Sequence, residues 1–156
     1  MAASDVLCRS GWRVRMVIGY SRGMDILTPE QEAMLVRLHE KGVFFHAVQN
    51  AYNHIIITDI EGVILYANQA TQRITGYSQQ EMIGKTPRLW GGQMPATFYA
   101  KLWKCIKQER NPFIGECTNR RKNGELYKAD ITISPMKEED GTLIGFIGIE
   151  EEIRAS

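Results

Sequence analysis

Alternation of apolar and polar residues predicts five β-strands in the part of the chain that begins near residue 54. Each segment is rich in branched or aromatic residues and is bounded by turn-forming residues. The predicted strands are His54–Thr58, Val63–Ala67, Phe113–Arg121, Glu125–Ser134 and Thr142–Glu151. The turn residues Asp59–Gly62, Asn123-Gly124 and Asp140-Gly141 favour tight connections between neighbouring strands. The pattern therefore predicts one hairpin and, later in the chain, a three-stranded meander.

The first 42 residues are predicted to form an extension with a helix of its own. Thr28-Pro29-Glu30-Gln31 combines a capping hydroxyl, a proline at the first helical position and a glutamine at the third. This helix is expected to end at Gly42. Upstream, apolar residues at every second position of Trp12–Ile18 suggest a short strand.

Helices are also predicted before and after the first hairpin. A helix is expected over Val43–Tyr52, and Ser78-Gln-Gln-Glu81 is a further capping box. Residues 95–108 carry apolar side chains at helical spacing, whereas Pro87 and Gly91 prevent one continuous helix before them. Two strands, a helical crossover and three strands predict an α+β domain over residues 43–152, with an antiparallel sheet and helices on one face. Residues 153–156 are expected to begin a linker or to end the chain.

Composition narrows the class of protein. The 156 residues are 44% hydrophobic and 24% charged, with a formal net charge of +1, which is typical of a globular protein and gives no basic field for nucleic acid. The basic run Arg120–Lys122 lies beside a turn and is interpreted as a solvated loop edge. No apolar stretch is long enough for a membrane span, so a cytoplasmic protein is expected. Three widely spaced cysteines indicate reduced thiols and no metal site.

The order of elements and six short sequence motifs resemble a PAS domain with its C-terminal PAC segment. The motifs are Ile57-Thr58-Asp59, Gly62-x-Ile64-x-Tyr66-Ala67-Asn68, Thr75-Gly76-Tyr77-Ser78, Glu81-Met-Ile-Gly84, Asn119–Glu125 and Thr132-Ile133-Ser134-Pro135. The resemblance implies a five-stranded sheet that cups a pocket closed by helices. It also implies a sensory module of a bacterial signalling protein, without enzymatic activity of its own, whose output domain lies outside this chain.

Within this family, the sequence motifs most resemble those of the FAD-binding redox and oxygen sensors of aerotaxis receptors and nitrogen-fixation regulators. The shared features are Leu102-Trp103, Pro112-Phe113 and Asn119–Lys122. By this resemblance, Trp103 would pack against the isoalloxazine ring and Asn119 would hydrogen-bond its polar edge. Phe113 and Asn68 complete the predicted set of cofactor-binding residues, although Asn68 could also cap the helix that follows it.

Two other cofactor chemistries are disfavoured by the same resemblance. Iron-ligating members take a histidine from the long helix, whereas His39, His46 and His54 all precede or begin the first strand, so haem is not expected. The light-reactive members carry Asn-Cys-Arg where this chain has Thr86-Pro87-Arg88, so a flavin–thiol adduct is not expected either. No metal and no catalytic residue is predicted.

Strand periodicity adds a physical argument for a ligand. Phe113, Gly115, Cys117 and Asn119 share one face of their strand, which is the natural inward face. A buried amide without a partner costs roughly 1 to 3 kcal/mol, so Asn119 needs a ligand or a backbone group beside it. Two features depart from the flavin relatives: the turn between Trp103 and Pro112 is one residue longer, and the aromatic residue after the proline is Phe113 where tryptophan is common. Trp103 could also be a core aromatic residue.

Two functions of different classes follow. The first is a flavin-based sensor, in which electron uptake changes protonation of the flavin ring, the Asn119 amide reorients and the sheet shifts. The second is a ligand-free or metabolite-binding module that relays signals through a homodimer built from the N-terminal helix and the outer sheet face. Since both faces of the last strand are apolar, Phe146→Asp is expected to weaken this dimer. The carboxylate run Glu150–Glu152 is interpreted as solvated, which leaves no acid/base pair for an enzyme.

Overall fold

The computed structural model describes residues 28–153, and these divide into two units between Gly42 and Val43. In the first unit, helix α1 (Pro29–Glu40) begins with the predicted capping box. The Thr28 side chain accepts a hydrogen bond from the Gln31 amide, and Gln31 in turn accepts one from the Thr28 amide. Gly42 has a positive φ of 66°, as expected where this helix ends. The strand predicted over Trp12–Ile18 lies outside the described residues.

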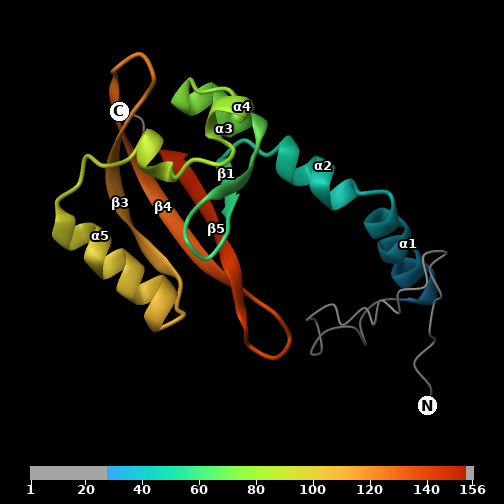
Figure 1. Ribbon diagram of the computed structural model, residues 1–156. Coiled ribbons are helices and arrows are strands. Elements are labelled where there is room, and N and C mark those ends of the chain that lie inside the picture. Colours follow the sequence, from blue (N-terminus) through green and yellow to red (C-terminus); the bar gives the residue numbers. More distant parts are fainter. Residues whose placement is uncertain (1–27, 154–156) are drawn as a thin grey trace. The chain divides into compact units, whose positions relative to one another are not determined.

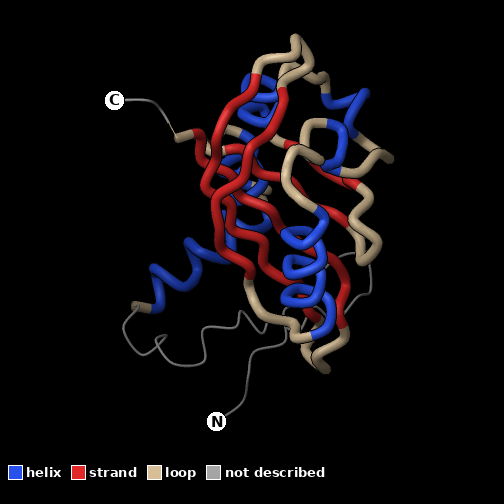
Figure 2. The backbone as a smooth tube through the Cα atoms, turned by 90° about the vertical axis from the view of Figure 1, so that its left-hand side faces the viewer, coloured by secondary structure: helices blue, strands red, loops and turns tan. Residues whose placement is uncertain are grey.

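The second unit is a five-stranded antiparallel sheet with helices on one face, which confirms the predicted fold class (Figures 1 and 2). The strand order is β2-β1-β5-β4-β3. In chain order the elements are α2 (Val43–Gln49), β1 (His54–Thr58), β2 (Ile64–Ala67), α3 (Gln69–Thr75), α4 (Gln79–Met82), the 3-10 helix η2 (Pro87–Leu89), α5 (Ala96–Trp103), the π-helical η3 (Lys104–Gln108), β3 (Phe113–Arg120), β4 (Leu126–Lys137) and β5 (Leu143–Glu152).

The predicted β1–β2 hairpin is present and depends on its turn residues. The Asp59 carboxylate accepts hydrogen bonds from the Glu61 and Val63 amides, each at 2.9 Å. Gly62 adopts a φ of 82°, and a Cβ atom there would lie 3.0 Å from the Trp103 ring. The turn therefore needs glycine for its backbone conformation and for the close approach of an aromatic side chain.

The long predicted helix over residues 95–108 is present but changes its pitch halfway. After α5 the chain continues into η3, where the Glu109 amide donates to the Lys104 carbonyl at 3.0 Å in an i→i+5 hydrogen bond. A π turn holds one residue more than an α turn. Such a turn would accommodate the additional residue that the resemblance to the flavin-binding class predicts between Trp103 and Pro112.

The expected position of Phe146 on an outer face that could mediate dimerisation is wrong. Phe146 is only 2% exposed and lies in the core on the inner face, while Ile147 and Ile149 form the outer, half-buried row. The pairing of β4 with β5 shifts at Met136/Lys137, and Leu143 packs against the same core as Phe146. An irregularity of one residue changes which side chains share a face, and alternation alone does not reveal it.

Gly145 stands at this irregularity because the neighbouring backbone leaves no room for a side chain. A Cβ atom at this position would lie 2.2 Å from the carbonyl oxygen of Thr58. The close approach of β5 to β1 therefore requires glycine, and it directs Phe146 toward the helices.

Candidate functional site

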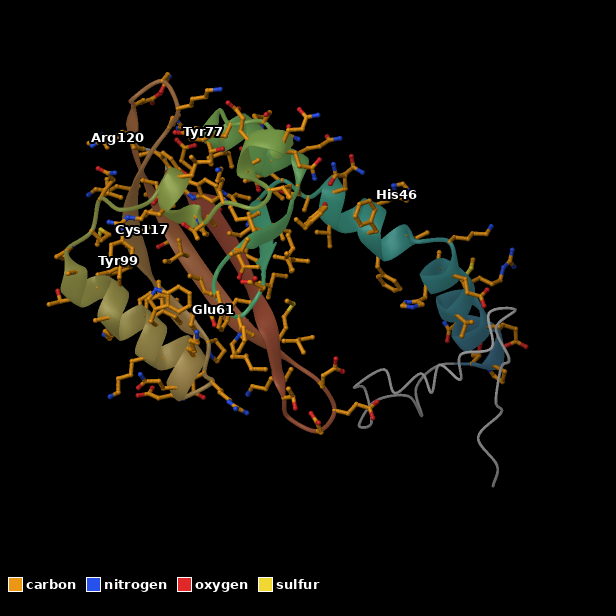
Figure 3. The ribbon with its side chains drawn as sticks, in the orientation of Figure 1. His46, Glu61, Tyr77, Tyr99, Cys117 and Arg120 are labelled. Carbon is orange, nitrogen blue, oxygen red and sulfur yellow. The ribbon has the colours of Figure 1, made fainter. Side chains whose placement is uncertain are left out.

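A cavity of about 550 Å³ lies between the inner face of the sheet and the segment that contains η2, α5 and η3. Its walls are mainly apolar, with side chains from both layers such as Leu102, Ile106, Ile131, Ile133 and Phe146. Figure 3 shows Tyr99 on α5 and Cys117 on β3, two of the residues that line opposite sides of this space. The fold thus places a mainly apolar cavity, open to the surface on one side, beneath the helical crossover.

The structure brings Trp103 and Asn119 together as lining residues of this cavity. Trp103 is 38% exposed, and its ring meets the Phe146 ring edge-on at a centroid distance of 5.8 Å. Asn119 is 4% exposed and faces inward from β3, as the strand periodicity predicted. One predicted residue therefore stands where the cavity meets the surface and the other at a buried wall.

The other two predicted cofactor residues do not line the cavity. Asn68 is fully buried and caps α3, with its side-chain oxygen accepting from the Thr71 and Ile55 amides, each at 3.0 Å. Phe113 is buried in the core, where its ring meets Phe98 edge-on at 5.4 Å. Because Phe98 does line the cavity, Phe113 lies one contact behind its wall. A cofactor-binding role for the four residues stays a prediction.

The partner of the Asn119 amide is a carboxylate. Asn119 Nδ2 donates to Glu150 Oε2 at 3.0 Å, and Trp90 Nε1 lies 3.4 Å from Glu150 Oε1. The Glu150 side chain is 14% exposed and lines the cavity, so the interpretation of this residue as solvated is wrong. Residues 146, 148 and 150 share one face of β5, and this period is the signal that would have identified Glu150 once Phe146 is placed inside.

A second polar residue that the sequence analysis did not assign to the site is His54. It is fully buried, its ring meets that of Trp90 at 5.2 Å, and its Nδ1 lies 3.4 Å from Glu150 Oε2 without hydrogen-bond alignment. Neither ring nitrogen has a hydrogen-bond partner among residues 28–153. Burial lowers the pKa of His54, and the nearby Glu150 charge partly opposes this shift.

A family model described as the PAS fold matches residues 42–153. This chain belongs to the PAS family. This chain is 34% identical over 134 residues to the nitrogen fixation regulatory protein of Klebsiella oxytoca, covering 85% of this chain but only 27% of that protein. It is 33% identical over 104 residues to the aerotaxis receptor of Escherichia coli, covering 63% of this chain and 20% of that receptor. The prediction of a PAS module for sensing and signal transduction is thereby confirmed.

Solved structures show the same fold at low sequence identity. A PAS domain from Colwellia psychrerythraea superposes with a TM-score of 0.64 at 19% identity, covering 76% of this chain and 97% of that one. An RNA-binding light-oxygen-voltage receptor gives a TM-score of 0.65 at 21% identity, covering 72% and 33%. At these identities the similarity establishes the PAS architecture alone.

The thiol of Cys117, which lines the PAS cavity, has low nucleophilic reactivity. Burial raises the pKa of Cys117 to about 12, and the neighbouring Glu150 charge adds to the rise. The thiolate that would act as a nucleophile is therefore scarce near neutral pH. Among the described residues, no cluster of histidine, cysteine or carboxylate side chains could hold a metal ion. Within residues 28–153, no helix has the length and apolar character to cross a membrane.

Proposed function

We propose that this PAS domain binds a flavin, in the form of FAD, and acts as a redox or oxygen sensor for an output domain outside this chain. The observation that carries the proposal is the shared cavity of Trp103 and Asn119, since these are the residues that the flavin-binding class uses by resemblance. Its volume of about 550 Å³ lies within the range of roughly 300 to 1,000 Å³ of small-molecule sites. In this proposal the PAS domain itself has no catalytic role, and any enzymatic output activity belongs to other domains.

The chemistry of the lining suits a planar aromatic ring with one polar edge. Apolar side chains from α5 and β4 would cover the faces of the ring, while Trp103 would stack at the exposed side. Asn119 and Glu150 form a polar group at the buried wall, where they would meet the hydrogen-bonding edge. When bound, a flavin would supply the electron-transfer chemistry. The Asn119 side-chain amide has two N–H groups, of which one donates to Glu150, so the other would be the donor to the ring.

Absorption spectroscopy of the purified chain tests this proposal. We expect visible flavin absorbance as isolated or after refolding with FAD. Trp103→Ala and Asn119→Leu are each expected to raise the dissociation constant of FAD about tenfold, because stacking area or an amide hydrogen bond is lost. Ile114→Ala, which changes an outward residue of β3 that is 77% exposed, serves as the control and should bind as wild type. A colourless protein that takes up no FAD on refolding would contradict the proposal.

The outer sheet face supports a second role, homodimerisation. The half-buried residues Ile147 and Ile149 lie on this face, and Phe45 of α2, which is 57% exposed, meets the Tyr66 ring edge-on at 5.5 Å. Apolar surface of this kind suits a second copy of the chain. The proposed dimer uses this face together with the N-terminal helical region.

Light scattering of a charged variant tests the dimer. Because Phe146 is internal, the informative change is Ile147→Asp, which is expected to convert a dimer into a monomer by placing a charge in the contact. Ile83→Asp introduces the same charge at an exposed residue that ends α4, away from the outer sheet face, and should leave the dimer intact. Circular dichroism verifies that both variants are folded. A monomeric wild type, or an Ile147→Asp variant that keeps the dimer mass, would reject this role.

A further inference from the structure

Glu150 occupies a position between two competing partners. In the strand order β1-β5-β4-β3, His54 pairs directly with Glu150 from β1, whereas Asn119 lies on the other side of β5, on β3. Both partners approach the same atom. Glu150 Oε2 lies 3.0 Å from Asn119 Nδ2 and 3.4 Å from His54 Nδ1, and only the contact with Asn119 is a hydrogen bond. A movement of this oxygen toward β1 therefore takes it away from Asn119.

Glu150 also borders a second hollow, on the protein surface. A groove on the protein surface is lined by Tyr52, Arg73, Arg121, Asp130, Glu151 and Glu152, and Glu150 lines both this groove and the cavity. No other residue is shared by the two linings within the described part of the chain. Glu150 therefore borders both the groove and the cavity, and His54 lies 3.4 Å from its carboxylate.

The other titratable groups around Glu150 do not compete for a proton near neutral pH. Burial and the Glu150 charge raise the pKa of both the Cys117 thiol and the Tyr127 phenol, so these groups are already protonated. Arg121 is paired with Glu152 at 2.6 Å and with Glu125 at 3.3 Å. The remaining carboxylates of the groove are Asp130 on β4 and Glu151, which is exposed. His54 is the group that contacts Glu150 and has its ring nitrogens unpaired.

We propose that a proton on His54 draws the Glu150 carboxylate toward β1 and thereby releases the Asn119 N–H that it holds, so that both N–H groups of this amide can donate into the cavity. The proton comes from a hydronium ion of the solvent, which leaves a water molecule, and it adds to the neutral imidazole, so that Nδ1–H donates to the Glu150 carboxylate at Oε2 and the charges of the pair cancel. No other covalent bond forms or breaks. This regulation rests on the proposed function only for its consequence. The consequence is that a ligand that accepts a hydrogen bond from Asn119 binds more tightly at acid pH.

The direction of the pH effect follows from the surroundings of His54. Burial lowers its pKa below the ordinary value of 6.5, so protonation occurs on the acid side of that value. The Glu150 charge raises the pKa, so its removal must lower the pKa further. A folded-state pKa below the unfolded one also means that stability is lost as the pH falls from about 6.5 through the folded-state pKa.

Nuclear magnetic resonance of the ligand-free chain tests the switch. Isotope-labelled protein is titrated from neutral to acid pH while the His54 ring and the Asn119 side-chain amide are followed. His54 is assigned by the loss of its signal in His54→Gln. We expect one shared midpoint for the two groups in the wild type. In Glu150→Gln the His54 midpoint should fall and the Asn119 signal should no longer follow it. Glu151→Gln, the same change at the neighbouring exposed residue, should keep the shared midpoint.

Three outcomes would overturn the switch. These are an Asn119 amide that ignores the titration of His54, a His54 ring that does not titrate while the chain is folded, and equal effects of Glu150→Gln and Glu151→Gln. If Glu150→Gln does not fold, the wild type and His54→Gln decide, since the Asn119 transition must vanish in the latter. No flavin enters these measurements. Failure to bind flavin would therefore leave this result intact, and a flat titration would leave the flavin proposal intact.

Discussion

Replacing Trp90 by alanine is expected to lower the free energy of unfolding by about 3 to 5 kcal/mol. Trp90 is 1% exposed and packs in the cluster formed by Ile56, Ile64, Ala67 and Met82. Its ring also covers His54, and its indole N–H faces Glu150. The variant would leave a large cavity and would remove a donor from a half-buried carboxylate. Denaturant unfolding followed by circular dichroism gives the change.

Trp103→Ala is the matched control for this effect. The same substitution at a ring that is 38% exposed should cost only about 1 to 2 kcal/mol, because less packing is lost. The two tryptophans are expected to separate in function as well, with Trp103 affecting flavin affinity and Trp90 affecting the fold. Equal destabilisation by the two variants would show that Trp90 is not the core residue that its burial indicates.

Replacing Asn68 by alanine is expected to destabilise the domain by about 3 kcal/mol. The Asn68 side chain connects three segments: its oxygen accepts from Ile55 and Thr71, and its amide donates to the carbonyls of Asn53 at 2.9 Å and Val48 at 3.1 Å. Alanine removes the acceptor of the Ile55 and Thr71 amides, and each buried unpaired group costs roughly 1 to 3 kcal/mol. Equilibrium unfolding in urea measures the loss.

Asn123→Ala provides the comparison for Asn68. Asn123 accepts one hydrogen bond, from the Glu125 amide in an exposed turn, so its loss should stay below about 1 kcal/mol. Since Asn68 does not line the cavity, FAD bound per folded molecule should be unchanged in Asn68→Ala. If Asn68→Ala were as stable as the wild type, or if it lost only the binding of FAD, Asn68 would be a ligand-binding residue and not a structural one.

Local signals in the sequence were sufficient for most secondary structure. The capping boxes at Thr28 and Ser78 and the glycine turns at Gly62 and Gly124 depend on residues within a few positions of one another. The inward direction of Asn119 likewise follows from the period of a single regular strand. These features were predictable because the interactions that determine them act within one element or one turn.

The face of β5 was not predictable in the same way. Alternating residues suggested two apolar faces, but the shift of register at Met136/Lys137 and the contact of Gly145 with Thr58 decide which one is internal. Both are relations between strands. The error placed Phe146 outside, and with it the cavity position of Glu150 was missed.

The sequence by itself determined the family, the order of elements and two cavity residues, because short motifs and strand periods encode them locally. Only the tertiary structure decided what surrounds Asn119. Glu150 meets its partners Trp90 and Asn119 across 60 and 31 positions of the chain, and it meets His54 through strand pairing. Such contacts arise when the sheet closes in the order β1-β5-β4-β3. The run Glu150–Glu152 therefore contains one half-buried carboxylate, Glu150, which lies between His54 and the Asn119 side of the cavity.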